Sequence, residues 1–195
     1  MTDLDARIFL LVYAAAGGVL TWLALLLSAI GSGWIIVALV ATCAIPRWRR
    51  WSLTLGATLA ASGVVVFVLK KIVDRHRPCV VLPGVHALCA MPTDPSFPSG
   101  HACGAFTAAV FIVVVMYGRE EARFPVLSPT GRGLLCALLV TMALGIAWSR
   151  VYLGVHFPID VTVGAFLGAW SGALGGKLYL RDATRGRRPC PDPIV

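Results

Sequence analysis

Residues 51–69 read WSLTLGATLAASGVVVFVL, a run without a charged residue that ends at Lys70. Apolar stretches of about 18 residues or more are typical of helices that cross a membrane. Further uncharged runs cover 8–46, 102–118, 133–148 and 161–176. Only 13% of the 195 residues are charged, whereas soluble domains are charged at about a quarter of their positions. The sequence therefore predicts an all-α, polytopic transmembrane helix bundle.

The expected bundle has five core spans, with a long outside loop over 73–98. These spans are predicted over 31–46, 51–71, 99–118, 132–149 and 157–178. The first thirty residues form either an interfacial helix or a sixth membrane helix, because the run 8–46 is barely long enough for two crossings. We favour the interfacial segment, with breaks at Gly17-Gly18 and Gly31-Ser32-Gly33. Residues 1–180 are expected to be one membrane domain, followed by a flexible basic tail over 181–195.

The formal charge of +8 is concentrated in three basic groups that follow the predicted topology. If the spans alternate in direction, all three groups lie on one side of the membrane, and the positive-inside rule makes that side cytoplasmic. This distribution explains the charge without a nucleic-acid partner, and it places the C-terminus in the cytoplasm. The groups are Arg47, Arg49 and Arg50; Arg119, Arg123 and Arg132; and Lys177, Arg181, Arg185, Arg187 and Arg188.

Polar residues able to do chemistry gather in three clusters at the other ends of the apolar runs. The clusters are Lys70 with Arg77-Pro78, then Pro98-Ser99-Gly100-His101, and finally Ser149-Arg150 with His156 and Asp160. Alternating spans bring these clusters to the same, extracytoplasmic face. Charges at helix ends also avoid the several kcal/mol that burial in lipid costs.

The residue types in these clusters suit the binding and attack of a phosphate. Arginine presents a planar fork to phosphate oxygens, and lysine adds a point charge. Ser99 and Gly100 are typical of a helix start, whose free amides bind anions. His156 and Asp160 are four residues apart, which places them on one helix face. The carboxylate can then hold one imidazole nitrogen and leave the other free to attack phosphorus.

The three clusters together resemble the signature of the type 2 phosphatidic acid phosphatase superfamily, in order and in spacing. The resemblance covers about residues 60–175 and implies an integral-membrane lipid phosphatase. It also implies that His156 is the nucleophile, forming a phosphohistidine, that Asp160 orients it, and that His101 is the general acid. No metal or other cofactor is implied. The phosphate-binding residues that it implies are Lys70, Arg77, Ser99, Gly100 and Arg150.

Short members of this family are similar to bacterial undecaprenyl-pyrophosphate phosphatases, which recycle the cell-wall carrier lipid. The resemblance therefore favours that lipid pyrophosphate as substrate, in a bacterial inner membrane. Phosphatidylglycerol phosphate and phosphatidic acid remain alternatives. A lipid or anion transporter is a different class, but the spans carry essentially no polar groups near the midplane, where transporters need them. A phosphotransferase acting through the same phosphohistidine also remains open.

Two further features have more than one interpretation in the sequence. Cys79 and Cys89 flank the outside loop and would be able to form a disulfide in an oxidising compartment, or remain free thiols. Small residues at four-residue intervals let another helix approach closely, either in a homodimer or within the bundle. Such residues are Gly164, Gly168, Gly172 and Gly176.

Overall fold

The computed structural model describes residues 3–32, 41–118 and 128–185, and within these ranges its regular elements are all helices. The predicted all-α class is therefore confirmed. The helices are α1 (Asp3–Tyr13), α2 (Gly18–Gly31), α4 (Pro46–Val73), α5 (Pro78–Val81), α6 (Gly100–Tyr117), α7 (Pro129–Tyr152) and α8 (Pro158–Arg185).

Three segments of the described chain are long and apolar enough to cross a membrane, namely α4 with its continuation to Val81, α6 and α7. The sequence predicted five membrane spans. Helix α8 occupies the place of the last predicted span but does not meet this criterion, because its glycines and Lys177 make it less apolar. Half of the span predicted over 31–46, residues 33–40, lies outside the described residues. The exact number of crossings thus stays a prediction.

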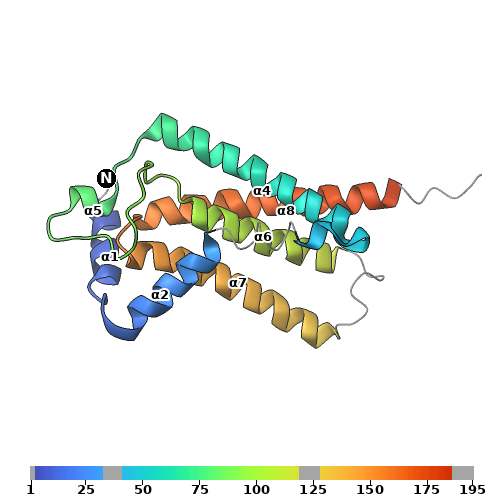
Figure 1. Cartoon of the computed structure of the whole chain (residues 1–195), viewed down its shortest axis with the longest axis horizontal. Helices are drawn as coiled ribbons and strands as arrows, with labels where there is room; N and C mark the ends of the chain where they lie inside the picture. Colours follow the sequence, from blue (N-terminus) through green and yellow to red (C-terminus); the bar gives the residue numbers. More distant parts are fainter. Residues whose placement is uncertain (1–2, 33–40, 119–127, 186–195) are drawn as a thin grey trace, which may run out of the picture.

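The N-terminal segment is two helices joined at a sharp bend. Helices α1 and α2 meet at 114° and would pass the membrane criterion only as one broken span. The bend falls at Gly17-Gly18, as predicted, where both glycines have positive φ angles of 154° and 53°. Gly18 adopts the left-handed conformation that side chains other than glycine rarely accept. This bend lets α1 lie across the end of the bundle beside α5 (Figure 1).

Helices α6 and α8 lie in direct backbone contact through the glycine repeat. A Cβ atom added to Gly168 would lie 2.2 Å from the carbonyl oxygen of Cys103, and one added to Gly164 would lie 2.5 Å from that of Ser99. Gly172 has the same relation to Thr107, at 2.4 Å. The repeat is therefore used for packing within the bundle, the second of the two interpretations.

Within the described residues, the basic ends of α4 and α8 and the chemical clusters lie at opposite ends of the bundle. Near the start of α4, Arg50 donates from Nη2 to the carbonyl oxygen of Tyr179 near the end of α8, at 3.2 Å. At the other end, the start of α6 meets the start of α8 (Figure 1). Helix α8 continues to Arg185, so the tail expected from residue 181 is helical through 185, and 186–195 lie outside the described residues.

The disulfide considered between Cys79 and Cys89 is not formed in the structure, where both thiols are free. The two side chains pack in different apolar clusters. Cys79 lies against the cluster that contains Phe9 and Phe157, whereas Cys89 lies against the cluster that contains Tyr152.

We expect Gly168→Ala to destabilise the bundle, because the new methyl group would push α8 away from the α6 backbone. Overpacking of this kind costs about 1–3 kcal/mol. Thermal unfolding in detergent should show a lower transition temperature. Gly104→Ala on α6 is the matched control, since a Cβ atom there meets no atom within 4 Å. Equal stability of the two variants would contradict the close packing.

Candidate active site

The candidate site is built where the first turns of α6 and α8 meet. The backbone N–H of Ser99 donates to the carbonyl oxygen of Asp160, at 2.9 Å. Pro158 begins α8, and its fixed φ suits a first helical turn. Ser99 is the N-cap residue of α6, as predicted. One hydrogen bond thus joins the second and third sequence clusters across 61 residues of chain.

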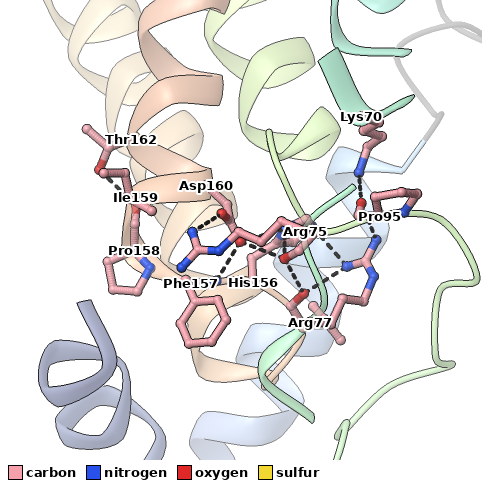
Figure 2. Close-up of polar contacts among 12 residues, drawn as sticks. Lys70, Arg75, Arg77, Pro95, His156, Phe157, Pro158, Ile159, Asp160 and Thr162 are labelled. Atoms are coloured by element: carbon pink, nitrogen blue, oxygen red, sulfur yellow. Dashed lines mark hydrogen bonds and ion pairs between the residues drawn. The ribbon is translucent and has the colours of Figure 1, made fainter. Parts of the chain in front are cut away.

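His156 lies in the turn between α7 and α8, and 2% of its surface is exposed. Its Nδ1 atom is 3.3 Å from Ser96 Oγ, and its Nε2 atom is 3.3 Å from Arg77 Nη1. Figure 2 shows His156 and Arg77 beside each other. The Ser96 hydroxyl donates to Asp160 Oδ2, at 2.6 Å, so Oγ accepts from Nδ1–H. This network assigns the proton to Nδ1 and leaves the lone pair on Nε2 facing the guanidinium.

Asp160 is fully buried and has a hydrogen-bond donor at each carboxylate oxygen. Oδ2 accepts from Ser96 and from the backbone N–H of Phe157, at 2.9 Å. Oδ1 accepts from Arg75 Nη1, at 2.5 Å. The direct distance from Oδ2 to His156 Nδ1 is 3.7 Å, which is too long for a hydrogen bond. The carboxylate therefore reaches the imidazole through the serine hydroxyl, where the sequence predicted direct contact.

Lys70 and Arg77 lie side by side and share one carboxylate. Lys70 Nζ is 3.0 Å from Asp94 Oδ2, and Arg77 Nη2 is 2.9 Å from Asp94 Oδ1. Both cations are buried, whereas about half of the Asp94 side chain is exposed. Arg77 also donates to the carbonyl oxygens of Val155 and Asp94. Two predicted phosphate-binding cations thus already hold an oxyanion.

Two other predicted residues present buried polar atoms without a protein partner. Within the described residues, Ser99 Oγ and Arg150 Nε belong to the four buried side-chain atoms that have no hydrogen bond. Arg150 uses Nη1 to donate to Ser28 Oγ of α2. Such orphaned groups are costly and call for an explanation. An anion bound between these side chains would satisfy both.

His101 and Gly100 lie in the first turn of α6, as expected for the helix start. Arg150 and Arg77 lie near enough to the imidazole of His101 for their charges to act on it. Gly100 is exposed, and a Cβ atom there would meet only Val66, at 3.8 Å. All eight predicted site residues are therefore gathered at one end of the bundle.

The charges of the site shift two titrating groups outside the membrane-spanning segments. Burial lowers the pKa of His156 to about 4, an effect opposed by the nearby Asp160 carboxylate and reinforced by the charges of Arg77 and Arg150. The imidazole is therefore neutral at pH 7. Burial alone would raise the pKa of Asp94, but the hydrogen bond and charge of Lys70, with the charge of Arg77, lower it below its usual value.

Four contributors to the site were missed from the sequence. Ser96 and Asp94 precede the second cluster closely, so a polar residue two to four positions before Pro98 was a usable signal. Arg75 lies in the outside loop and belongs to none of the three sequence clusters, yet it binds Asp160. Asp5, which holds the other side of Arg75, gave no signal because it comes from the N-terminal segment.

Comparison with known proteins places this geometry in a family. Residues 51–181 match the model of the PAP2 superfamily. The chain is 37% identical over 142 residues to the decaprenylphosphoryl-5-phosphoribose phosphatase of Mycobacterium tuberculosis strain H37Rv, which covers 73% of this chain and 69% of that protein. It is 33% identical over 120 residues to the undecaprenyl-diphosphatase of Sulfolobus acidocaldarius, which covers 60% of this chain and 51% of that protein.

The fold is similar to that of a solved membrane enzyme. The crystal structure of a transmembrane PAP2-type phosphatidylglycerolphosphate phosphatase from Bacillus subtilis superposes with a TM-score of 0.72 and 25% identity. The match covers 96% of this chain and 88% of that one. This agreement supports a multi-pass membrane fold for the whole described bundle.

The neutral, buried His156 should make stability fall as the solution becomes acidic. The unfolded chain takes up a proton as the pH falls through about 6.5, whereas the folded chain does so only near pH 4. Protonation of His156 therefore has no effect on stability above pH 6.5. By pH 4 it lowers the free energy of unfolding by about 3 kcal/mol. Thermal unfolding of wild type and His156→Gln at pH 7, 5.5 and 4.5 measures this. A parallel decline in the two proteins would contradict the assignment.

Proposed function

The chain belongs to the PAP2 superfamily, and from this we propose that it hydrolyses a polyprenyl-linked phosphate through a phosphohistidine on His156. The observation that carries the proposal is the orientation of this imidazole. Nδ1 faces the Ser96 hydroxyl and, through it, Asp160, while Nε2 faces Arg77. The lone pair on Nε2 therefore faces the Arg77 guanidinium. If Arg77 binds the phosphate, the nucleophile is already placed beside it.

In the proposed first step, Nε2 of His156 forms a bond to phosphorus as the bond from phosphorus to the leaving oxygen breaks. The imidazole becomes cationic, and Asp160 stabilises it through Ser96. His101, placed in the first turn of α6, protonates the leaving oxygen. In the second step water attacks phosphorus, His101 accepts its proton, and inorganic phosphate leaves from Nε2.

The charge that develops on the phosphoryl oxygens is met by groups fixed before the reaction. The guanidinium groups of Arg77 and Arg150 and the ammonium group of Lys70 are buried, where each charge acts more strongly than in water. Ser99 Oγ adds a hydrogen bond, together with the amides at the start of α6. We assign to these groups the binding of the transferred phosphoryl group.

The substrate class is proposed from the relatives and from the position of the site. The names of the two relatives described above both specify a polyprenyl-linked phosphate, with the terminal group either a second phosphate or a phosphoribose. Undecaprenyl diphosphate, favoured by the sequence, is our first candidate. Decaprenylphosphoryl-5-phosphoribose is the second, favoured by the 37% identity.

The orientation in the membrane is proposed from the charge distribution. The start of α4 and the end of α8, which carry basic residues, meet at the end of the bundle opposite to the site. The positive-inside rule places that end in the cytoplasm. The site would then open to the extracytoplasmic side of a bacterial inner membrane.

A substrate panel in detergent micelles tests the proposal by release of inorganic phosphate. We expect a higher kcat/KM with undecaprenyl diphosphate and decaprenylphosphoryl-5-phosphoribose than with phosphatidylglycerol phosphate and phosphatidic acid. His156→Ala should lose kcat by several orders of magnitude while keeping its elution volume in gel filtration. A preference for the glycerolipids would contradict the polyprenyl substrate class. An active His156→Ala variant would show that His156 is not the nucleophile. Lipid movement without phosphate release would indicate a transporter.

Ser96→Ala tests the interposed hydroxyl. Without Ser96 Oγ, the imidazole and Asp160 are 3.7 Å apart and lose their connection. We expect kcat to fall by about tenfold to a hundredfold with little change in KM, as for other partners that orient a functional histidine. Thr162→Ala is the control, because that hydroxyl is exposed and bonds only to its own helix, at Pro158 (Figure 2). Equal kcat values would show that the hydroxyl does not orient His156.

A further inference from the structure

Arg75 joins the site to the N-terminal helix through two carboxylates. Its Nη1 atom is 2.5 Å from Asp160 Oδ1, and its Nη2 atom is 2.6 Å from Asp5 Oδ2 of α1. Figure 2 marks the contact between Arg75 and Asp160. The exposed fractions of the Asp5 and Asp160 side chains are 5% and 0%. Salt bridges between exposed groups contribute little, but here both carboxylates are buried and the Arg75 side chain between them is only 18% exposed.

Each member of the array is fixed by a second contact. Asp5 Oδ1 accepts the backbone N–H of Ile159, in the first turn of α8, at 3.0 Å. The guanidinium of Arg75 lies over the ring of Phe157, with its Cζ atom 4.3 Å from the ring centroid. Removing one partner from such a buried set leaves a charge uncompensated. The array therefore holds the start of α8 at a defined position and charge.

From this geometry we infer that Asp5 and Arg75 are positioning residues for the reaction, acting on His156 through Asp160. This inference rests on the proposed function, in which His156 is the nucleophile. Asp5 lies outside the 51–181 segment that matches the family. Helix α1 thus completes the site of this chain with a residue that the matched segment does not contain.

The array predicts in which direction the loss of Asp5 or of Arg75 shifts the pKa of His156. Asp5 draws part of the Arg75 charge away from Asp160, which leaves Asp160 more negative toward the imidazole. Loss of Asp5 should therefore disfavour the protonated form of His156, and loss of Arg75 should favour it. An opposite charge within about 4–6 Å shifts a pKa by about 1–3 units. The other charged or titrating groups that act on the His156 ring are Arg77, Arg150 and His101.

The experiment is a titration of the His156 imidazole by NMR in detergent micelles, with isotope-labelled histidine. The chain has four histidines, so a His156→Gln sample identifies the signal. Relative to wild type, we expect the midpoint to fall in Asp5→Asn and to rise by about one pH unit in Arg75→Gln. The double variant, which loses one charge of each sign, should return toward the wild-type midpoint.

Kinetic measurements on the same proteins distinguish two roles of the array: positioning His156 for the reaction, or only holding α1 in place. We expect kcat to fall about tenfold in Asp5→Asn with KM unchanged, and Arg75→Lys to recover part of the activity lost in Arg75→Gln. Asp74→Asn is the control, because that carboxylate is exposed and its left-handed backbone (φ 44°) accepts asparagine.

Opposite displacements of the two midpoints support the inference, and coincident or same-sign displacements overturn it. If Arg75→Gln does not fold, the midpoint of Asp5→Asn decides alone, with a value at or above that of wild type counting against the inference. If wild type releases no phosphate from any lipid, the proposed function fails. The titration still decides whether the array controls His156.

Discussion

The direct backbone contact between α6 and α8 is the constraint on which the site depends. Glycines on α8 remove the side chains that would separate the two helices, so Gly164 meets Ser99 and Gly168 meets Cys103. At the end of this contact the Ser99 amide reaches the Asp160 carbonyl. Two helix starts are thus aligned, and their polar residues converge although no single segment of the chain contains the site.

The convergence brings many charges into a small buried volume, and the structure compensates them in pairs. Asp94 lies between Lys70 and Arg77, and Arg75 lies between two carboxylates. Isolated buried ions would cost several kcal/mol each. Because most of these charges have a partner on another element, the site also fastens the outside loop, α1 and α8 to one another.

The all-α class and the gathering of the eight predicted site residues at one end of the bundle followed from the sequence, because hydropathy and short spacings are local signals. The break at Gly17-Gly18 was predicted for the same reason. The sequence did not predict the ion pairs of Arg75 with Asp160 and with Asp5, since these partners are 85 and 70 residues apart. Ser96 was close in sequence, but only the fold shows that its hydroxyl lies between an imidazole and a carboxylate.

Asp94 has a consequence for the turnover of the site. Its carboxylate spans the two cations as an intramolecular counter-ion, on a side chain that is about half exposed. In the proposed reaction, an arriving phosphate dianion would exchange with this group instead of meeting bare positive charge, and the tethered carboxylate would return at a high effective concentration after hydrolysis. The tether would thereby weaken the binding of the orthophosphate product and free the site for the next cycle.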